Sequence, residues 1–560
     1  MSMKTSTWFI LILATLALGA ALRIQGINFG APAADARPDE NLVIAEAVYL
    51  LAGDQVRFHR YPPALMYVYA GLFEIGSTLG LLDNDHLYGY AVDPLPYHLI
   101  GRWFTAILGI ATIVLVSLTA HRLFSWHASL VAAACMAFYP LHVLHSHFAT
   151  VDVPAAFFAA LAIHLTLTAK RGDSKKLIAA AFVAGVAAAV KYPVGMVAIL
   201  PLIRVLWNRN GWRSTLFVCL ATVAGLLMAA PTWLTDPTGV WDGIQTEAAS
   251  QHGRRDLMSW GEITSHHGRF SLIAGFGTLA MLTSTLGFVV GAKRQRSLLL
   301  LVIFAVLLSL FNVFLGVPFA RYFVPLAPIL ALATASLCSH ASPKFLAWTV
   351  AILVGLQTPN LIHSHFSSEM LSQRDTRAQL LDAFANGTLP RDIPVIRPSW
   401  PFDSFPIATN AAFSLAPLTP SATASKRENL TRELAAKLRP ETNRLRVFEF
   451  GEKQKSEIDL AQILSDNDML YIEPETPAFG DESLTFPFQR NAVGPDVRKS
   501  VAAGMVKMTL LLDLDPRLDG AFPDGSMFER FEYWFLPMED ARAVRRPGPR
   551  IRVFRISAKK

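Results

Sequence analysis

Long apolar runs dominate the first 361 residues and predict helices that cross a membrane. The first run extends from Thr5 to Ala21, and we interpret it as a retained helix because no small-residue cleavage site follows it. Further spans are predicted at roughly 101–120, 128–147, 153–169, 177–190, 194–207, 215–233, 270–291, 297–316, 323–339 and 345–361. One helix needs about 20 apolar residues to cross the bilayer core. The pattern therefore predicts a polytopic α-helical membrane protein with about eleven transmembrane helices.

Two stretches depart from this pattern. Residues 25–100 are mixed and polar, which predicts a long outer loop with short helices along the membrane surface. A weak apolar stretch at Leu65–Leu82 leaves one further span open as an alternative. Beyond residue 361 a helical pattern reaches Ala385, and strand-like runs follow at Leu445–Phe450, Met469–Ile472, Val506–Leu512 and Arg552–Ile556. We expect a membrane domain at 1–361 and a soluble mixed α/β domain at 362–560.

The charge balance supports a membrane protein. Only 17% of the 560 residues are charged and 52% are hydrophobic, whereas roughly a quarter are charged in an average soluble domain. The net charge of +7 comes largely from basic residues in alternate short loops. The sequence shows no basic stripe with interleaved aromatic residues, so we do not expect nucleic-acid binding. The three cysteines, Cys135, Cys219 and Cys338, lie in apolar runs and indicate neither a disulfide framework nor a zinc site.

The basic loops predict the orientation of the chain. They carry Lys4, Arg122, Lys170, Arg171, Lys175, Lys176, Arg209, Arg213, Lys293, Arg294, Arg296 and Lys344. Because basic loops face the cytoplasm, we expect the N-terminus inside. The loops 25–100 and 234–269, the turns 148–152, 191–193 and 317–322, and the C-terminal domain are then expected outside.

Ionisable residues recur on this outer side, near predicted helix ends. They are Asp39 and Glu40, Asp152 with His142, His145 and His147, Lys191 with Tyr192, and Arg321 with Tyr322. Charges near a membrane core are costly and often functional. Their recurrence on one side favours a shared polar cavity. Interfacial anchoring is the alternative for any single residue.

Several of these segments resemble, in order, the motifs of the GT-C membrane glycosyltransferases. They are Arg37-Pro38-Asp39-Glu40, Arg60-Tyr61-Pro62-Pro63, Gly101-Arg102-Trp103, the run from Phe138 to Pro154, Ala188 to Tyr192, Phe319 to Leu326, and Arg546 to Phe554. The nearest branch looks like the protein O-mannosyltransferases, the lipid A aminoarabinose transferase ArnT and the bacterial RgtA/B/C/D-like enzymes. The resemblance implies a GT-C-like fold in a cell inner membrane.

The resemblance also implies a reaction. Such enzymes move one sugar from a polyprenyl-phosphate donor to a lipid, glycan or protein acceptor outside the membrane. The acceptor hydroxyl needs a general base, and the matching residue is Asp39, with Glu40 as a helper. The donor phosphate needs cations, which the resemblance assigns to Lys191, Arg321 and Arg60. Relatives often have Lys directly before the proline pair, where this chain has Tyr61.

The remaining candidates are less specific. Arg102 is a further phosphate ligand or an interfacial residue. Asp152 is expected to orient the sugar or acceptor, and Tyr61, His145, His147, Tyr192 and Tyr322 to contact substrate. No cofactor is required by this interpretation. A divalent metal bound by Asp152 and the histidines stays open as an alternative. Substrate contact by residues of the loop 234–269 also stays open, although a solvated loop is the simpler interpretation. These residues are Glu247, His252, His266 and His267.

Three other functions fit parts of the sequence. A transporter or flippase would use the same intramembrane charges as a substrate path, but no inverted repeat is visible and the charges gather on one side. A non-catalytic envelope assembly protein would not need Asp39, Glu40 and Asp152 together. The third alternative is an enzyme that transfers a whole oligosaccharide. The short turn before Asp152 favours transfer of a single sugar instead.

Overall fold

The structure is a computed structural model, and its residues form two compact units. It describes residues 5–34, 36–56, 58–255, 258–315, 319–398, 447–450, 468–475, 503–504, 506–518 and 537–558. The first unit comprises Met1–Ile27, Leu42–Gly71 and Ile100–Ser368, and the second comprises Asn28–Asn41, Leu72–Leu99 and Glu369–Lys560. The expected division at residue 361 stays a prediction.

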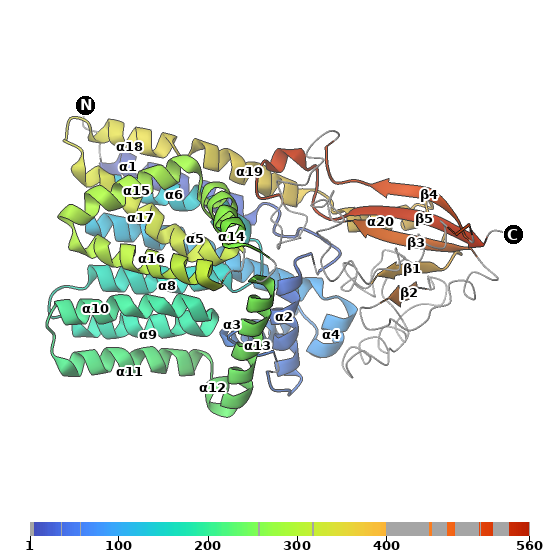
Figure 1. Cartoon of the computed structure of the whole chain (residues 1–560), viewed down its shortest axis with the longest axis horizontal. Coiled ribbons are helices and arrows are strands. Elements are labelled where there is room, and N and C mark those ends of the chain that lie inside the picture. The colour runs from blue at the N-terminus through green and yellow to red at the C-terminus, as the bar shows by residue number, and fades with distance from the viewer. Residues whose placement is uncertain are drawn as a thin grey trace. The chain divides into compact units, whose positions relative to one another are not determined.

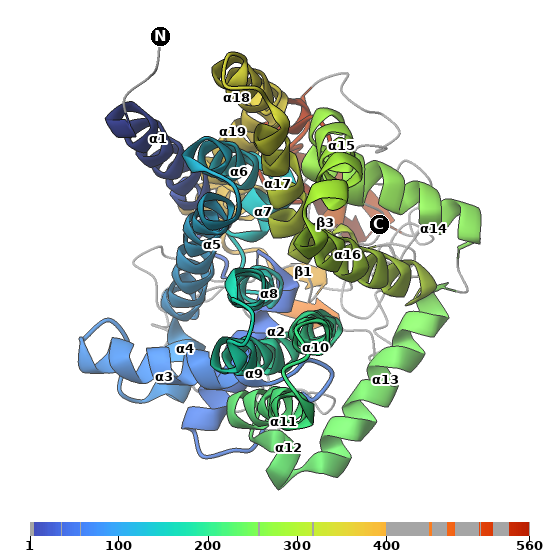
Figure 2. The same ribbon diagram turned by 90° about the vertical axis from the view of Figure 1, so that its left-hand side faces the viewer.

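The first unit is helical (Figures 1 and 2). Its apolar helices are α1 (Thr5–Ile24), α5 (Leu95–Leu123), α6 (Trp126–Phe138), α7 (Pro140–His145), α8 (Asp152–Thr168), α9 (Ser174–Val190), η1 (Tyr192–Ala198), α10 (Ile199–Trp207), α11 (Trp212–Ala229), η2 (His267–Ala274), α15 (Thr278–Arg294), α16 (Arg296–Leu315), η3 (Ala320–Leu326), α17 (Ala327–Ser336), η4 (Leu337–His340) and α18 (Leu346–Gly355). Each of the eleven predicted spans coincides with one or more of these helices.

Length and apolar composition identify the helices that can cross a membrane. Among the described residues they are Ser6–Ile24, Leu95–Leu123, Trp212–Ala229, Ala320–His340 and Leu346–Ala385, with a sixth if the bent pair Trp260–Ala274 and Thr278–Ala292 is one span. Four shorter apolar helices are Trp126–Phe138, Asp152–Thr168, Tyr192–Trp207 and Leu298–Phe314. The chain is thus an integral membrane protein, and the count of about eleven stays a prediction.

Small residues let the helices approach one another closely. Figure 2 shows α9 and α11 side by side, end-on. A Cβ atom at Gly185 of α9 would collide with the carbonyl oxygen of Thr222, and one at Gly225 of α11 with that of Phe182. Gly287 of α15 meets the Ala333 carbonyl of α17 in the same way. Such contacts between backbones are typical of helix packing in membranes.

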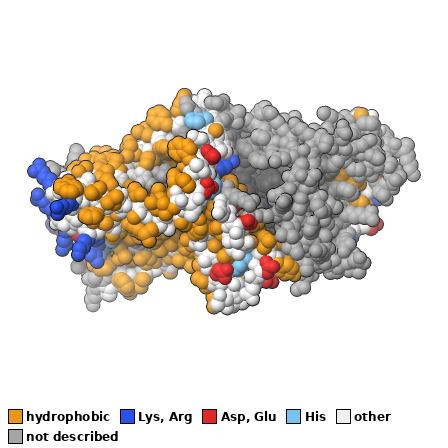
Figure 3. Space-filling view, turned by 90° about the horizontal axis from the view of Figure 1, so that it is seen from below, with side chains coloured by type: hydrophobic (Ala, Val, Ile, Leu, Met, Phe, Trp, Pro, Cys, Tyr) orange, Lys and Arg blue, Asp and Glu red, His pale blue; other side chains and the backbone are white. Residues whose placement is uncertain are grey.

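The surface of this unit suits a bilayer. Figure 3 shows hydrophobic side chains over its flank and Lys and Arg gathered at one end. Basic residues of the predicted inner loops are exposed, namely Arg122, Lys170, Arg171, Lys175, Arg209, Arg213 and Lys344. Lys4 and the side chains of Lys293, Arg294 and Arg296 lie outside the described residues.

The predicted outer loops contain helices. Residues 25–100 hold α2 (Pro38–Leu51), α3 (Ala64–Thr78) and α4 (His86–Val92), which agrees with a loop of short helices. The loop 234–269 is also largely helical, because it contains most of α13 (Pro237–Arg255) and α14 (Trp260–His266), after the short α12 (Thr232–Thr235). The backbone of this segment is therefore mainly helical and does not form the solvated loop that the sequence favoured.

The second unit contains a five-stranded mixed sheet with the order β2-β1-β3-β5-β4. The strands are β1 (Val395–Pro398), β2 (Val447–Phe450), β3 (Met469–Glu475), β4 (Val506–Leu514) and β5 (Arg550–Ala558). β1 pairs in parallel with β2 and β3, while β5 is antiparallel to β3 and β4. Buried Leu380 and Phe384 of α20 (Thr376–Ala385) pack with Leu470 and Val553 of the sheet.

The predicted helix and all four predicted strands of this region are confirmed. α20 begins at Thr376 because the Asp375 side chain accepts a hydrogen bond from the backbone N–H of Arg377, at 2.8 Å. The missed strand is β1, which follows Pro394 directly and has Pro398 as its last residue. Proline is rare inside strands, so these two prolines argued against a strand at this place.

Candidate functional site

A buried carboxylate marks the start of α8. Asp152 is the first residue of that helix and is 1% exposed. Its Oδ2 accepts a hydrogen bond from the Thr150 hydroxyl at 3.1 Å. The helix N-terminus favours a negative charge at this place, yet a carboxylate inside an apolar bundle also needs a partner.

That partner is Lys191. Helix α9 ends at Val190 because Pro193, two residues after Lys191, has no N–H to continue the helical hydrogen bonds. Lys191 therefore has an extended backbone, and its Nζ lies 2.5 Å from Asp152 Oδ1. Both side chains are buried, so this is a tight ion pair between two helix ends.

The segment η3 brings two more predicted residues to this pair. Pro325 interrupts α-helical hydrogen bonding there, and the segment forms a 3₁₀ turn. The Tyr322 ring lies under Lys191 Nζ, 4.2 Å from the ring centroid, which is a cation–π distance. Arg321 and His145 also interact electrostatically with Asp152. The carboxylate thus has two permanent cations near it.

A chain of hydrogen bonds continues from Tyr322 to the proline-pair loop. Gln251 Nε2 donates to the Tyr322 hydroxyl at 3.3 Å and also to Glu247 Oε1. Glu247 Oε2 in turn accepts from Arg60 Nε at 2.9 Å. Arg60, Asp152, Lys191 and Tyr322 are therefore parts of one polar network, which we call the Lys191 network.

Helix α13 also holds the loop that precedes the proline pair. The Asp236 side chain accepts a hydrogen bond from the Gly239 N–H at 2.9 Å and lies 3.1 Å from His59 Nε2. The Gly239 N–H lowers the pKa of Asp236, and Thr238 and His59 lower it further. Gly243 faces His59 so closely that a Cβ atom there would lie 2.5 Å from the His59 Cβ.

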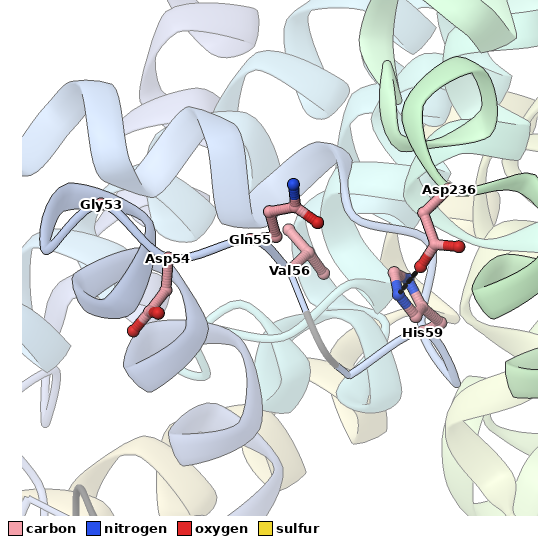
Figure 4. A pocket seen from close by; sticks show the side chains of 6 residues that line it. All are labelled: Gly53, Asp54, Gln55, Val56, His59 and Asp236. Carbon is pink, nitrogen blue, oxygen red and sulfur yellow. Dashed lines mark ion pairs between the residues drawn. The ribbon is translucent and has the colours of Figure 1, made fainter.

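A polar pocket opens beside this contact. It has a volume of about 460 Å³ and is lined by Gly53, Asp54, Gln55, Val56, His59 and Asp236. Figure 4 shows the His59 and Asp236 side chains meeting at one side of it. The pocket lies in the same loop as Arg60, directly before the proline pair.

Other predicted residues of the first unit lie outside the Lys191 network. Arg102 is fully buried and donates to the Ile27 carbonyl at 3.4 Å. His147 contacts the carbonyl oxygens of Val143 and Gln25 through its two ring nitrogens, at 3.0 and 2.9 Å. Tyr61 and Tyr192 make edge-to-face ring contacts with Phe58 and Trp233. Arg102 and His147 thereby connect the segment after α1 to the bundle.

The acidic pair of the first loop belongs to the second unit. Pro38 begins α2, so Asp39 and Glu40 lie in its first turn, where a helix favours negative charge. Asp39 Oδ2 lies 4.0 Å from Arg37 Nη2, and its side chain is 15% exposed. Glu40 is fully buried, and its Oε2 lies 3.7 Å from His98 Nδ1. The two neighbouring acids therefore differ in accessibility.

Within the described part of the chain, no group of three or more His, Cys, Asp or Glu side chains is arranged to hold a metal ion. His145 and Asp152 interact with each other, but that pair alone is not a metal site. The three cysteines are free thiols.

Comparison with known proteins gives one partial family match and several matches in fold. Residues 99–234 match the sequence model of the family described as dolichyl-phosphate-mannose-protein mannosyltransferase. The apo crystal structure of ArnT from Cupriavidus metallidurans matches with a TM-score of 0.52 at 14% identity, over 90% of this chain and 96% of that chain. The same protein bound to undecaprenyl phosphate matches with a TM-score of 0.52 at 13% identity, over 99% and 98%. The chain therefore shares the fold of ArnT, and its residues 99–234 resemble the mannosyltransferase family.

The chain has no significant match among curated protein sequences. Its likeness to ArnT thus lies in the fold, which extends over nearly the whole length of both chains. The predicted fold class is confirmed: a polytopic helical membrane protein with a C-terminal region that contains a sheet.

Sequence reasoning missed Gln251 and His98, and it gave Glu247 only as an open candidate. Gln251 connects Tyr322 to Glu247, and Glu247 itself was expected in a solvated loop. Their spacing of four residues on a helix is a signal that could have paired them. His98, the neighbour of Glu40, had no local signal, because it lies in the first turn of a long apolar helix.

Proposed function

We propose that this enzyme transfers a single sugar from a polyprenyl-phosphate donor to a lipid, glycan or protein acceptor outside the membrane. The observation that carries the proposal is the Asp152–Lys191 ion pair with Arg321 beside it, buried in a GT-C fold. Charged groups inside a membrane bundle usually mark a functional site. The matching ArnT structure that holds undecaprenyl phosphate supports the choice of donor.

In this proposal the cations bind the donor phosphate. Lys191 and Arg321 face one carboxylate, so a phosphate placed beside them meets two positive charges. Asp152 and the Tyr322 ring fix the direction of the Lys191 ammonium group. Arg60 and Arg102 are further candidates for the phosphate. Cations fixed in place before the reaction stabilise the charge that develops on a leaving phosphate.

The acceptor is activated by the acidic pair. Asp39 takes the proton of the acceptor hydroxyl as the new bond from that oxygen to the sugar's anomeric carbon forms. The bond from the anomeric carbon to the phosphate oxygen breaks, and the lipid phosphate leaves with both electrons. Asp39 suits this role because its side chain is partly exposed, whereas Glu40 is buried and acts as the helper. His145, His147, Tyr61, Tyr192 and Tyr322 remain candidates for sugar or acceptor contacts.

We place the protein in a cell inner membrane, with the N-terminus in the cytoplasm and the C-terminal domain outside. The exposed basic loops support this orientation. In a chain whose exposed Cys219 is replaced by Ser, Asn386→Cys should react with an impermeant thiol reagent added to spheroplasts, and Arg171→Cys should not. The opposite labelling would reverse the orientation.

Binding of a polyprenyl phosphate to the full-length protein in nanodiscs tests the phosphate site. Lys191→Ala and Arg321→Ala should each weaken binding by about 10- to 100-fold, because a hydrogen bond to a charged group contributes about 1.5–3 kcal/mol. Lys175→Ala, which removes an exposed lysine of a predicted inner loop, is the matched control. If Arg321→Ala, which keeps the Asp152–Lys191 pair, binds like the Lys175 variant, Arg321 has no role in the phosphate site.

A further inference from the structure

Arg23 is a buried cation in the last turn of α1, and its partners are carbonyl oxygens and an imidazole. Its Nη1 donates hydrogen bonds to the carbonyl oxygens of Gly19 and Ala137, at 2.8 and 3.0 Å. Its Nη2 donates to the Met136 carbonyl at 2.9 Å and to His142 Nδ1 at 3.0 Å. The guanidinium thus ties α1 to the junction between α6 and α7, and Figure 2 shows these helices as neighbours.

The carbonyl groups at this junction need donors from elsewhere. Helix α6 ends at Phe138, and the last carbonyls of a helix have no backbone partner within it. The next helix begins with Pro140, which has no N–H to offer to Met136. The Phe138 carbonyl accepts a hydrogen bond from the Ser364 hydroxyl of α19 (Thr358–Ser372) at 3.0 Å. Two other helices therefore supply donors for the last three carbonyl groups of α6.

An arginine fits this place for two reasons. The C-terminal end of a helix carries a partial negative charge, and Arg23 lies at such an end of both α1 and α6. Its planar guanidinium also presents donors in several fixed directions, whereas a lysine has only one nitrogen. Arg23 can therefore bond α1, α6 and α7 at once, which a lysine at the same position cannot do.

The same contact determines where His142 carries its proton. A guanidinium can only donate, so His142 Nδ1 must accept, and the neutral ring has its proton on Nε2. Within the described part of the chain, Nε2 has no hydrogen-bond partner, although it is buried. Arg23 is therefore the side chain that sets this tautomer.

Helix α5 closes the junction from another side. A Cβ atom at Gly109 would lie 2.6 Å from Ser146 Oγ and 3.3 Å from Arg23 Cδ, so α5 packs against both side chains. The Ser146 hydroxyl in turn donates to the His142 carbonyl at 2.6 Å. The end of α7 therefore has little room to move while Arg23 holds its beginning.

We infer that Arg23 is a positioning residue that fixes α7 and, through it, Asp152 of the Lys191 network. His145 is the last residue of α7 and interacts electrostatically with Asp152, and residues 146–151 connect that helix to Asp152. The inference rests on the proposed function, because Asp152 must direct Lys191 toward the donor phosphate for its position to matter. Arg23 touches neither donor nor acceptor in this account.

Binding of a polyprenyl phosphate to the full-length protein in nanodiscs tests the inference. Arg23→Lys keeps the charge but not the full set of bonds, and it should weaken binding about 10-fold, within the range for a residue that acts through others. Ser364→Ala removes the donor of one carbonyl and should weaken binding about 3-fold.

A matched control is a serine that makes the same kind of bond elsewhere in the unit. Ser336 is as buried as Ser364 and donates to the Gly287 carbonyl, from α17 to α15, at 3.2 Å. Ser336→Ala should leave binding unchanged. If it weakens binding as much as Ser364→Ala does, the effect is general loss of packing and the inference is wrong.

A double variant separates positioning from general stability. Once Lys191→Ala has removed the group that Arg23 helps to direct, adding Arg23→Lys should weaken binding by less than about 2-fold more. If the two factors multiply instead, Arg23 does not act through the Lys191 network.

Nitrogen NMR of the protein labelled at histidine gives a readout that needs no donor. The His142 signal is the one that His142→Gln removes, and it should report a neutral ring with the proton on Nε2. Arg23→Lys should shift the Nδ1 signal, because the donor to that nitrogen is lost. A proton on Nδ1 in the wild type, or an unchanged Nδ1 signal in the variant, would overturn the inference.

The outcomes distinguish this inference from the proposed function. If Lys191→Ala and Arg321→Ala bind like the Lys175→Ala control, the proposed phosphate site is wrong, and Arg23 has no such site to position. If those variants weaken binding while Arg23→Lys and Ser364→Ala do not, the phosphate site stands and only the positioning role fails. Ser364→Ala, which leaves Arg23 in place, decides the question if Arg23→Lys does not fold.

Discussion

Asp152 and Glu40 are both buried carboxylates beside a basic side chain, but their partners differ in kind. Asp152 is in direct contact with Lys191 at 2.5 Å, and lysine keeps its charge near neutral pH. Glu40 lies 3.7 Å from His98, whose charge depends on one proton. The first pair is a direct contact between opposite charges, whereas the second lies beyond hydrogen-bond distance.

This difference suits the two roles that we propose. A phosphate site needs cations that stay charged throughout turnover, and Lys191 with Arg321 provides them. Glu40, the proposed helper of Asp39, lies instead beside a histidine, which can be neutral, and a pair without two full charges costs less desolvation. Burial alone therefore does not tell whether an acid binds, reacts or positions.

The largest expected effect comes from breaking the fixed pair. Lys191→Met leaves the Asp152 carboxylate buried without its close cation, and we expect a loss of about 3–5 kcal/mol of unfolding free energy. Denaturant unfolding in detergent micelles measures it. Adding Asp152→Leu to Lys191→Met should recover most of that loss. If the double variant is as unstable as the single one, the lost stability does not come from the stranded charge.

A smaller effect is expected at the other pair. In His98→Ala the Glu40 carboxyl can keep a proton and stay neutral, so the loss should be about 1–3 kcal/mol, as for an unsatisfied buried polar group. The same unfolding assay compares the two variants directly. A loss equal to that of Lys191→Met would remove the distinction between fixed and adjustable pairs.

The smallest effect is expected at the half-exposed Arg60–Glu247 pair. Its side chains are 34% and 25% exposed, so solvent screens the charges. Glu247→Gln should change the unfolding free energy by less than about 1 kcal/mol. We expect a larger relative effect on donor binding, because Arg60 would no longer be held to α13. Unfolding and nanodisc binding, measured side by side, check both.

The sequence predicted the membrane part of the fold because apolar runs report burial in lipid directly. The strands β2, β3, β4 and β5 were predicted from runs of strand-forming residues, whereas β1, which follows Pro394 and ends at Pro398, was not. Among the site residues, Asp152, Lys191 and Arg321 were grouped because each sits at a predicted helix end on one side. The contact between Glu40 and His98 joins residues 58 positions apart along the chain, from 40 to 98, and no periodicity encodes it.

The same limit applies to the helix α13. Its mean composition is polar, so residues 237–255 looked like a loop. Its structure depends on the Asp236 cap and on close packing of Gly243 against His59. The cap is a local contact, whereas the packing of Gly243 against His59 is a tertiary contact, which propensity does not report.

The most direct test of the proposed transfer is release of lipid phosphate by the purified full-length protein. Nanodiscs would be offered a panel of polyprenyl-phosphate sugars together with an envelope extract as the source of acceptor. We predict release with one donor, and a fall of about 1000-fold in Asp39→Asn, within the range for loss of a general base. Equal release by wild type and Asp39→Asn, or no release with any donor in the presence of extract, would contradict the account.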